Sequence, residues 1–208
     1  MKKLVVATGN AHKLDEYRAL LPGIQLASMS EFPPMEPVEE DAPDFIGNAI
    51  LKALAVHSHT GLAALADDSG LEVEALNQRP GVFSARYAAG TDRDRYLKLL
   101  GEMENQPNRL ARFACAIAIA GLPEKNSDDS IIYRDGCWVS VGYCYGQITE
   151  EPNGTNGFGY DPIFSVNDGR TMAQLTAAEK HAISHRGQAT KPIINVLRSL
   201  MGVYSGSI

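Results

Sequence analysis

The sequence predicts a mixed α/β fold, because apolar runs typical of buried strands occur along the chain together with segments of helical periodicity. Residues 4–7, 62–66 and 113–120 are the clearest runs, and they are apolar almost throughout. Residues 46–57 instead carry apolar side chains at the spacing of one helix face. Helices and strands do not alternate strictly, so we expect a mixed sheet with flanking helices rather than a regular doubly wound one.

The composition is that of a globular protein with a mild negative charge. With 208 residues, 44% of them hydrophobic, the chain is long enough for one domain with a sizeable core. The formal net charge of −6 argues against a duplex nucleic-acid binder, but it does not exclude a small anionic ligand. Three cysteines without a CxxC pair do not favour a disulfide framework or a structural zinc site.

The N-terminal apolar stretch, residues 4–7, is too short for a signal peptide or a membrane span. We therefore expect a cytoplasmic protein that has neither a membrane nor a nucleic acid among its partners.

The first elements form a strand–turn–helix unit. Residues 4–7 are the strand and Thr8-Gly9-Asn10 the turn, with Asn10 as the expected N-cap. Residues 14–21 place apolar side chains at helical spacing, and Pro22-Gly23 ends the helix.

The next segment is expected to be a loop, a helix and a second strand. Residues 29–44 are rich in proline and acidic residues, as loops are. The helix over residues 46–57 should stop at Gly61. Residues 62–66 form the strand, and the two carboxylates Asp67 and Asp68 follow it and precede a turn at Ser69-Gly70.

In the middle of the chain, Pro80-Gly81 marks a loop, and residues 91–94 match a capping box that opens a helix. The side chains expected to point inward from that helix are Tyr96, Leu97, Leu100 and Met103. Residues 113–120 should form a central strand buried on both faces, followed by a polar loop over residues 123–136.

The C-terminal part continues this mixture. Residues 137–148 alternate weakly and fit one strand or two, and residues 163–166 fit a short strand. A second capping box at residues 176–179 opens another helix. The last helix, over residues 189–200, should be kinked by Pro192 or carry it in its first turn.

The adjacent carboxylates of Asp67 and Asp68 are the most informative feature. At the carboxyl end of a strand, they would lie where open α/β sheets hold their ligands. Carboxylate oxygens suit Mg²⁺, which usually arrives with phosphate. An acidic β-turn is the alternative, because Asp, Ser and Gly all favour turns.

The segment from Thr8 to Lys13 is a candidate phosphate site. Backbone N–H groups at a helix N-terminus attract anions, and Lys13 would add a positive charge. The segment lacks the GxxxxGK[ST] pattern, so it is not a P-loop. An ordinary N-cap followed by a solvated lysine is the alternative.

Three further features carry charges that could serve a phosphate or metal site. The acidic cluster Glu39-Glu40-Asp41 would complete a Mg²⁺ site only if its loop folded back toward Asp68; otherwise it is a solvated surface. Lys52 lies off the apolar stripe of its helix and could equally be exposed. Arg86 could bind phosphate through its planar guanidinium or pair with a structural carboxylate.

A glycine-rich segment at residues 154–162 could receive a nucleobase. An exposed Phe158 offers a face for stacking, and Asp161 can accept hydrogen bonds from base N–H groups. A glycine-rich hairpin with a buried phenylalanine is the alternative. His185 and Arg186 can donate hydrogen bonds to carbonyl or phosphate oxygens, although a lone histidine is often structural.

Five segments together resemble the inosine triphosphate pyrophosphatase family, most closely its bacterial branch. The resemblance runs in order through nearly the whole chain, and its most specific motifs are Ala-Asp-Asp-Ser-Gly-Leu, Gly-Phe-Gly-Tyr-Asp-Pro and Ser-His-Arg. The matching segments are residues 8–13, 45–52, 66–71 with 80–87, 157–164 and 183–189.

This resemblance implies an elongated mixed α/β sheet with flanking helices, in one domain spanning residues 1–208 with two lobes around a central cleft. It implies a homodimer and a Mg²⁺-dependent hydrolysis of purine nucleoside triphosphates to the monophosphate and pyrophosphate. ITP, dITP and XTP are the implied substrates.

The resemblance also assigns site residues by motif. Asp68 matches the general base and a Mg²⁺ ligand, and Glu40 matches the second metal ligand, with Glu39 as the alternative. The positions matched to the triphosphate are Thr8, Gly9, Asn10, Ala11, His12, Lys13 and Lys52. The positions matched to the base are Ser69, Phe158, Gly159, Tyr160, Asp161, Lys180, His185 and Arg186.

Selectivity is expected to depend on position 6 of the purine. Hypoxanthine and xanthine carry a carbonyl there, which donors from His185, Arg186 or the backbone would recognise. Two other functions stay open from the sequence: a pyrophosphatase acting on modified pyrimidine nucleotides, and a regulatory module that binds nucleotides without hydrolysing them.

Overall fold

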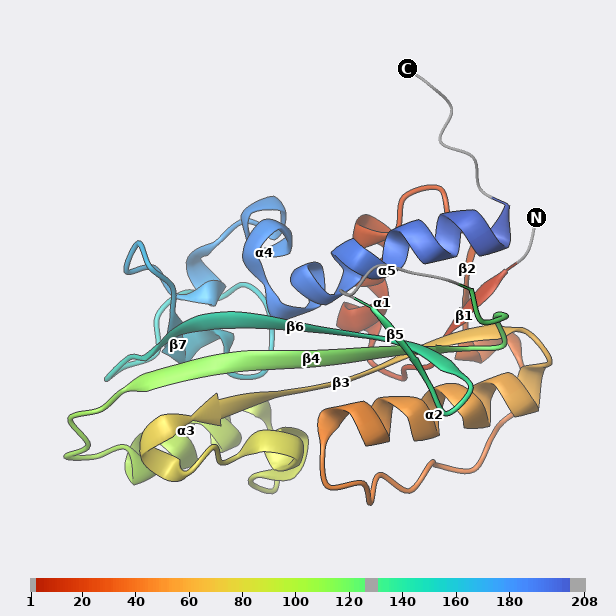
Figure 1. Ribbon diagram of the computed structural model, residues 1–208. Helices are drawn as coiled ribbons and strands as arrows, with labels where there is room; N and C mark the ends of the chain where they lie inside the picture. Colours follow the sequence, from red (N-terminus) through yellow and green to blue (C-terminus); the bar gives the residue numbers. More distant parts are fainter. Residues whose placement is uncertain (1–2, 126–130, 203–208) are drawn as a thin grey trace. The chain divides into compact units, whose positions relative to one another are not determined.

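The computed structural model describes residues 3–125 and 131–202 (Figure 1). The strands are β1 (Leu4–Val6), β2 (Leu26–Ser28), β3 (Ala63–Val73), β4 (Leu110–Ala120), β5 (Ile132–Arg134), β6 (Cys137–Ile148) and β7 (Phe164–Ser165). The α-helices are α1 (Ala11–Leu20), α2 (Phe45–Thr60), α3 (Asp92–Glu102), α4 (Ala177–Ile183) and α5 (His185–Met201). Short 3₁₀ helices are η1 (Met29–Glu31), η2 (Glu74–Leu76), η3 (Gly81–Arg86), η4 (Asp161–Ile163) and η5 (Met172–Gln174). Within the described ranges, no helix is both long and apolar enough to span a membrane.

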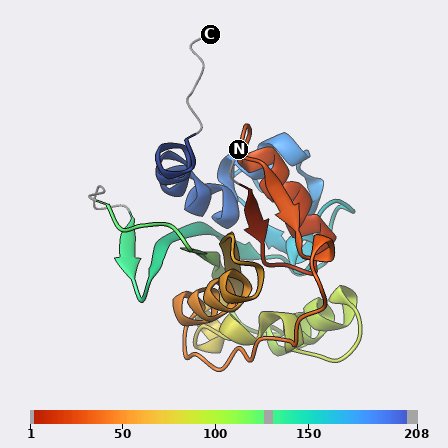
Figure 2. The same cartoon turned by 90° about the vertical axis from the view of Figure 1, so that its right-hand side faces the viewer.

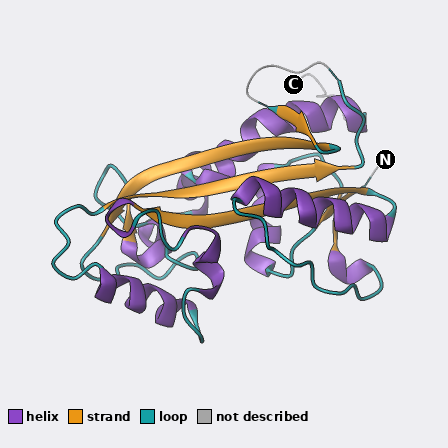
Figure 3. Cartoon of the chain, turned by 60° about the horizontal axis from the view of Figure 1, so that its bottom comes forward, coloured by secondary structure: helices purple, strands orange, loops and turns teal. Residues whose placement is uncertain are grey.

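The strands form a mixed sheet, as predicted (Figure 3). Its order is β2-β1-β3-β4-β6-β5, and β7 pairs with β6. Strand β1 pairs in parallel with β2 and β3. Strands β5 and β7 pair antiparallel with β6. The short strand β2 and the helix η1 had no counterpart in the sequence prediction.

The chain divides into two compact units. The first comprises Met1–Asp68, Cys115–Gly142 and Arg186–Ile208, and the second comprises Ser69–Ala114 and Tyr143–His185. The boundaries fall inside β3, β4 and β6, so each of these strands contributes residues to both units.

In the first unit, α2 lies on one face of the strands and α5 on the other (Figures 1 and 2). Because side chains alternate along a strand, Cys115, Ile117 and Ile119 of β4 pack with α1 and α5. Ala116, Ala118 and Ala120 pack with α2, where their small side chains admit its Ala49 and Ala53. The predicted burial of this strand on both faces is confirmed.

The start of α1 and the end of α2 are set by local signals, as predicted. The Asn10 side chain accepts hydrogen bonds from the amides of His12 and Lys13 and so caps α1. Helix α2 begins after the capping residue Asp44 and ends at Gly61, whose φ of 68° is the left-handed conformation that favours glycine.

The predicted turn at Ser69-Gly70 is wrong, and so is the alternative of an acidic turn that includes Asp67 and Asp68. Strand β3 continues through Asp67, Asp68, Ser69 and Gly70 to Val73. Leu71 and Val73 are fully buried in the second unit, so the strand resumes its apolar packing after the polar residues. The carboxylates can lie inside a strand because cations distant in sequence neutralise them, and this packing overrides the turn propensity of the four residues.

The core of the second unit forms around Leu71, Val73, Phe113 and Phe164. The Thr91–Asp94 capping box that opens α3 is confirmed. The expected inward position of Leu97 is wrong, because this side chain is 42% exposed while Leu99 is fully buried. The residues that pack inward from α3, at one helical face, are Tyr96, Leu99, Leu100 and Met103.

Several predicted boundaries shift. The polar loop over residues 123–136 contains β5, while residues 126–130 lie outside the described part of the chain. Residues 137–148 form one strand, and the strand expected at 163–166 is reduced to β7. Pro192 lies inside α5, which begins at His185 rather than near residue 189.

Candidate active site

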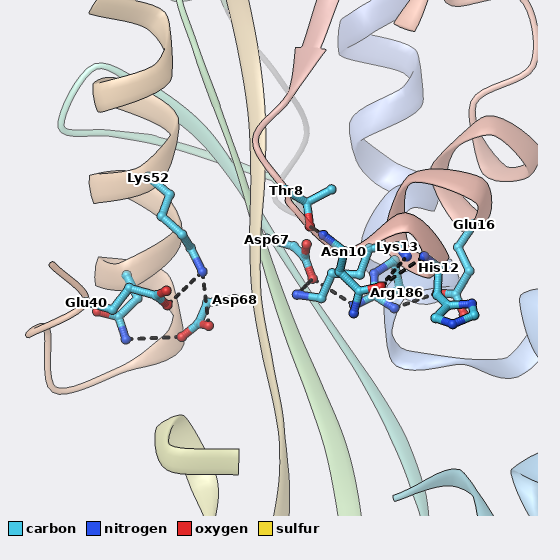
Figure 4. Close-up of polar contacts among 11 residues, drawn as sticks. Thr8, Asn10, His12, Lys13, Glu16, Glu40, Lys52, Asp67, Asp68 and Arg186 are labelled. Atoms are coloured by element: carbon cyan, nitrogen blue, oxygen red, sulfur yellow. Dashed lines mark hydrogen bonds and ion pairs between the residues drawn. The ribbon is translucent and has the colours of Figure 1, made fainter. Parts of the chain in front are cut away.

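Asp67 and Asp68 leave β3 on opposite sides, because successive side chains of a strand point to opposite faces (Figure 4). Asp68 points toward α2, and Asp67 points toward α1 and α5. The two carboxylates therefore belong to separate charge clusters rather than to one paired site.

The cluster on the α2 side joins Asp68, Glu40 and Lys52. Lys52 Nζ lies 2.8 Å from Glu40 Oε2 and 3.2 Å from Asp68 Oδ1. The side chain of Lys52 is only 15% exposed, so it is not the solvated lysine of the alternative interpretation. One ammonium group thus lies between two carboxylates that are 28 residues apart in the sequence.

Asn48, one helical turn before Lys52 on α2, is the second partner of Asp68. Its Nδ2 donates to Asp68 Oδ2 at 3.1 Å, and its Oδ1 accepts the Ala42 N–H at 3.0 Å. Asn48 is fully buried.

Burial and charge shift the pKa values of this cluster. Burial raises the pKa of Asp68 above its usual value, although Lys52 and the hydrogen bond from Asn48 act in the opposite direction. Burial lowers the pKa of Lys52, but the Asp68 and Glu40 carboxylates outweigh it and the net pKa is raised. Lys52 therefore remains an ammonium ion at neutral pH.

The loop before α2 folds back toward Asp68, as it must if its acidic residues are to contribute to a Mg²⁺ site with Asp68. It brings Glu40 to Lys52, whereas Glu39 is exposed. Across residues 3–125 and 131–202, no three His, Cys, Asp or Glu side chains are arranged to hold a metal ion. Two carboxylates that already share one cation nevertheless fit Mg²⁺, which is commonly held by one or two carboxylates plus phosphate oxygens and water.

The cluster on the other side of β3 is a buried chain of alternating charges. Asp67 Oδ2 accepts hydrogen bonds from Lys13 Nζ at 3.0 Å and from Arg186 Nη2 at 2.8 Å. Arg186 Nη1 donates to Glu16 Oε2 at 2.5 Å, and the guanidinium also lies over the ring of Tyr17. The Arg186 side chain is 1% exposed. Burial lowers its pKa, but Asp67 leads a set of neighbouring groups that raise it well above its usual value.

The turn between β1 and α1 is exposed at Gly9, Asn10 and His12. Thr8 Oγ1 accepts the Asn10 N–H at 3.1 Å, which fixes the turn at the start of the helix. Lys13 extends from this turn to Asp67, and so it lies on the opposite side of β3 from Asp68.

In the second unit, the glycine-rich segment folds around Asp161. Lys180 Nζ and the Phe158 N–H both donate to Asp161 Oδ2, at 2.7 and 2.9 Å. The Lys180 ammonium also lies 4.7 Å from the centre of the Phe158 ring. Gly157 has a φ of 77°, and a Cβ there would lie 2.0 Å from Asp161 Oδ2, so only glycine fits.

The neighbours of Phe158 hold this segment in place. Tyr160 is buried and donates from its hydroxyl to Ser84 O at 2.9 Å. The Gly159 N–H donates to Asp92 Oδ2 at 2.6 Å. Phe158 is only half-buried, which does not fit the alternative of a glycine-rich hairpin with a buried phenylalanine. The buried aromatic side chain of this segment is Tyr160.

His185 and Arg186 have different surroundings, although they are adjacent. The buried His185 ring stacks on Phe113 of the second unit, with 4.8 Å between ring centroids. Arg186 belongs to the Asp67 cluster of the first unit. Arg86 is exposed and lies over the Phe83 ring. Ser69 directly follows Asp68 in β3.

The sequence matches the Ham1 family over residues 4–196. The chain belongs to the Ham1 family. This confirms the resemblance that the motifs indicated.

Curated relatives and solved structures agree with this membership. A dITP/XTP pyrophosphatase of Shigella flexneri is 44% identical over 96% of this chain and 100% of its own length. The dITP/XTP pyrophosphatase of Geobacter sulfurreducens is 45% identical over 91% and 93%. The Ham1 protein structure from Staphylococcus aureus has a TM-score of 0.81 at 38% identity, covering 95% of this chain and 99% of that one. The HAM1 structure from Coxiella burnetii has a TM-score of 0.80 at 43% identity, covering 96% and 100%.

The sequence prediction gave no role to Asn48 and Glu16, which the structure places in the clusters of this Ham1 chain. It paired Asp67 with Asp68 as a candidate metal ligand, whereas the structure places Asp67 with Lys13 and Arg186. A signal existed for Asn48, since it is a polar residue beside the apolar Ala49 and Ile50 and one turn from Lys52. No local pattern identifies Glu16, because its partner is 170 residues away. Family membership points to a divalent metal as cofactor. The carboxylates of Asp68 and Glu40 are the negatively charged groups that could bind it.

Proposed function

We propose that this Ham1 protein is a nucleoside triphosphate pyrophosphatase that hydrolyses ITP, dITP and XTP to the monophosphate and pyrophosphate. The observation that carries the proposal is the convergence of Asp68 and Glu40 on the single cation of Lys52. Two relatives with full-length similarity are dITP/XTP pyrophosphatases, which supports this choice of substrates.

Mg²⁺ is the proposed cofactor, held by Asp68 and Glu40. When bound, it would neutralise phosphate charge and polarise the phosphorus that is attacked. Lys52 would then bind a phosphate oxygen, since its ammonium is charged and already within reach of both ligands. Lys13 and the exposed turn from Thr8 to His12 would bind other phosphate oxygens.

Asp68 is proposed as the general base that accepts a proton from the attacking water. A carboxylate of raised pKa is a better base than an ordinary one, because its pKa lies nearer to neutral pH. Asn48 and Lys52 hold the carboxylate in one orientation, which would fix the direction of the proton transfer.

The purine is proposed to stack on Phe158, beside Lys180 and Asp161. Half-burial of Phe158 leaves part of its ring accessible, and the surrounding hydrogen bonds fix its backbone. A donor facing position 6, from His185 or a backbone amide, would favour a carbonyl over the amino group of adenine. Arg186 is assigned instead to hold Asp67, because its guanidinium is buried with Asp67 and Glu16.

Homodimerisation and a cytoplasmic location are further proposals, which rest on the family resemblance. Sedimentation of the full chain tests the first: we expect the mass of two chains.

Substrate selectivity gives the direct test of the function. We expect pyrophosphate release from ITP with Mg²⁺ to exceed that from ATP by about 10⁴-fold in kcat/KM, because an amino group at position 6 leaves a donor unpaired. A parallel panel with XTP, dUTP and modified pyrimidine triphosphates separates purine from pyrimidine specificity. Equal rates with ITP and ATP would defeat the selectivity argument, and binding of ITP without pyrophosphate release would favour a regulatory module.

Replacing Phe158 with alanine should weaken nucleotide binding rather than the chemical step. Loss of a stacked base costs about 1–3 kcal/mol, so we expect KM for ITP to rise about 5- to 150-fold with kcat little changed. Steady-state kinetics of Phe158→Ala measure this, with Phe83→Ala, at a phenylalanine that is 58% exposed, as the matched control. An unchanged KM in Phe158→Ala would remove Phe158 from the base site.

A further inference from the structure

The side-chain amide of Asn48 links Asp68 to the loop that carries Glu40. Its Nδ2 donates to Asp68 Oδ2 at 3.1 Å, and its Oδ1 accepts the N–H of Ala42 at 3.0 Å. Ala42 lies two residues after Glu40 in the loop that precedes α2. One side chain of α2 therefore holds both the strand that carries Asp68 and the loop that carries Glu40.

Burial of the Asn48 side-chain amide costs free energy unless its polar atoms are hydrogen-bonded. Asn48 is 0% exposed and precedes Ala49 and Ile50, which pack in the apolar core on the α2 side of the sheet. An amide buried in such surroundings loses its water and keeps only its protein partners. The partners of Asn48 are the Asp68 carboxylate and the Ala42 amide.

Asn48 also determines which oxygen of Asp68 faces the shared cation. Because Oδ2 is held by Asn48, Oδ1 faces Lys52 Nζ, which in turn contacts Glu40. Without this hydrogen bond the Asp68 carboxylate could rotate, and the Glu40 loop would lose its attachment to α2. Metal sites depend on such outer contacts to orient their ligands.

A second contact fixes the same loop. A Cβ added to Gly47 would lie 2.5 Å from Ala42 Cβ and 3.3 Å from Asp44 Oδ1. The loop therefore packs on α2 at a distance that only glycine permits, and a methyl group at residue 47 would push Ala42 outward.

We propose that Asn48 is a positioning residue that presets the spacing and orientation of Glu40 and Asp68 for a divalent cation, with Gly47 admitting the loop to its place. This inference rests on the proposed function, because it concerns the metal of that site. It assigns no direct contact between Asn48 and the metal or the substrate.

Binding of Mn²⁺ to the full chain without nucleotide, followed by electron paramagnetic resonance, tests the proposal, since carboxylate sites of this type accept Mn²⁺. We expect Asn48→Ala to raise the Kd for Mn²⁺ at least tenfold. Val56→Ala is the matched control, because Val56 is a buried residue of the same helix that packs in a different cluster. Its Kd should stay within twofold of the wild type.

Gly47→Ala keeps the test decisive if Asn48→Ala fails to fold. Alanine is the better helix former, so this variant should retain α2 while it displaces Ala42. We expect its Kd for Mn²⁺ to rise severalfold. A second readout is kinetic: the Mg²⁺ concentration for half-maximal activity should rise in these variants while KM for ITP at saturating Mg²⁺ stays within twofold.

The outcomes separate this proposal from the proposed function. If the wild type binds Mn²⁺ and the folded variants bind it within twofold, the role of Asn48 and Gly47 is overturned while the enzyme assignment stands. If the wild type releases pyrophosphate from ITP but binds no Mn²⁺ in the absence of nucleotide, a preset site is likewise overturned. If it releases none, the proposed function fails on its own assay.

Discussion

Asp68→Asn should lower the rate of pyrophosphate release from ITP by at least 10²- to 10⁴-fold, the usual contribution of a positioned general base. The loss should exceed this range, because the amide is also a poorer ligand for a divalent cation. Single-turnover measurements at saturating Mg²⁺ and ITP give the rate of the chemical step directly. Asp15→Asn, at an exposed carboxylate that pairs with Arg18, is the matched control and should be unaffected.

The fold of Asp68→Asn should survive, and the reason lies in the direction of the Asp68 pKa. A carboxyl group whose pKa is raised in the folded state is destabilised there in its ionised form at neutral pH. A neutral amide of the same shape removes that penalty. It loses one of the two hydrogen bonds that Asp68 accepts from Asn48 and Lys52, while Lys52 keeps Glu40 as a partner. The midpoint of thermal unfolding of Asp68→Asn should therefore lie within a few degrees of the wild-type midpoint, or above it. If Asp68→Asn keeps the wild-type thermal midpoint and releases pyrophosphate at a rate within fivefold of the wild type, Asp68 is excluded as the base.

Arg186→Met should cause the largest loss of stability, about 3–5 kcal/mol of unfolding free energy. The substitution removes the guanidinium that contacts Glu16 at 2.5 Å and Asp67 at 2.8 Å, while the contact between Lys13 and Asp67 remains. Removing one partner of a buried ion pair leaves a charge that burial has cut off from water. Urea unfolding followed by the fluorescence of Trp138, the single tryptophan, measures the change.

Two companion variants make this prediction specific. Arg18→Met breaks the exposed pair with Asp15 on α1, the helix that carries Glu16, and should cost about 0–1 kcal/mol because the two side chains are 59% and 68% exposed. Glu16→Gln combined with Arg186→Met removes the carboxylate charge that Arg186 contacts and should recover part of the loss, which a double-mutant cycle quantifies. A cost below about 1 kcal/mol for Arg186→Met would contradict the view of this cluster as a buried, interdependent chain of charges.

The parts of the fold that were predictable are those with local causes. The Asn10 cap, the helix of residues 45–60 and its end at Gly61 follow from residues within a few positions of one another. The central strand β4 was recognisable because burial on both faces leaves an uninterrupted apolar run.

The parts that were not predictable depend on distant partners. Asp-Asp-Ser-Gly has the composition of a turn, and only Lys13, Lys52 and Arg186 let it lie within a strand. The separation of Asp67 from Asp68 then follows from the alternation of a strand, which a turn would not impose. Arg186 was expected at the base because its motif matched, whereas its partners Glu16 and Asp67 become visible only in three dimensions.

The central claim is that Asp68 and Glu40 hold a divalent cation at the phosphates of the substrate. The most direct test is a crystal structure with Mn²⁺ and a non-hydrolysable inosine triphosphate analogue bridged between the α- and β-phosphorus atoms. The anomalous signal should lie between the Asp68 and Glu40 carboxylates, with Lys52 moved from between them to a phosphate oxygen. A cation bound elsewhere, with Lys52 still between the two carboxylates, would contradict the claim.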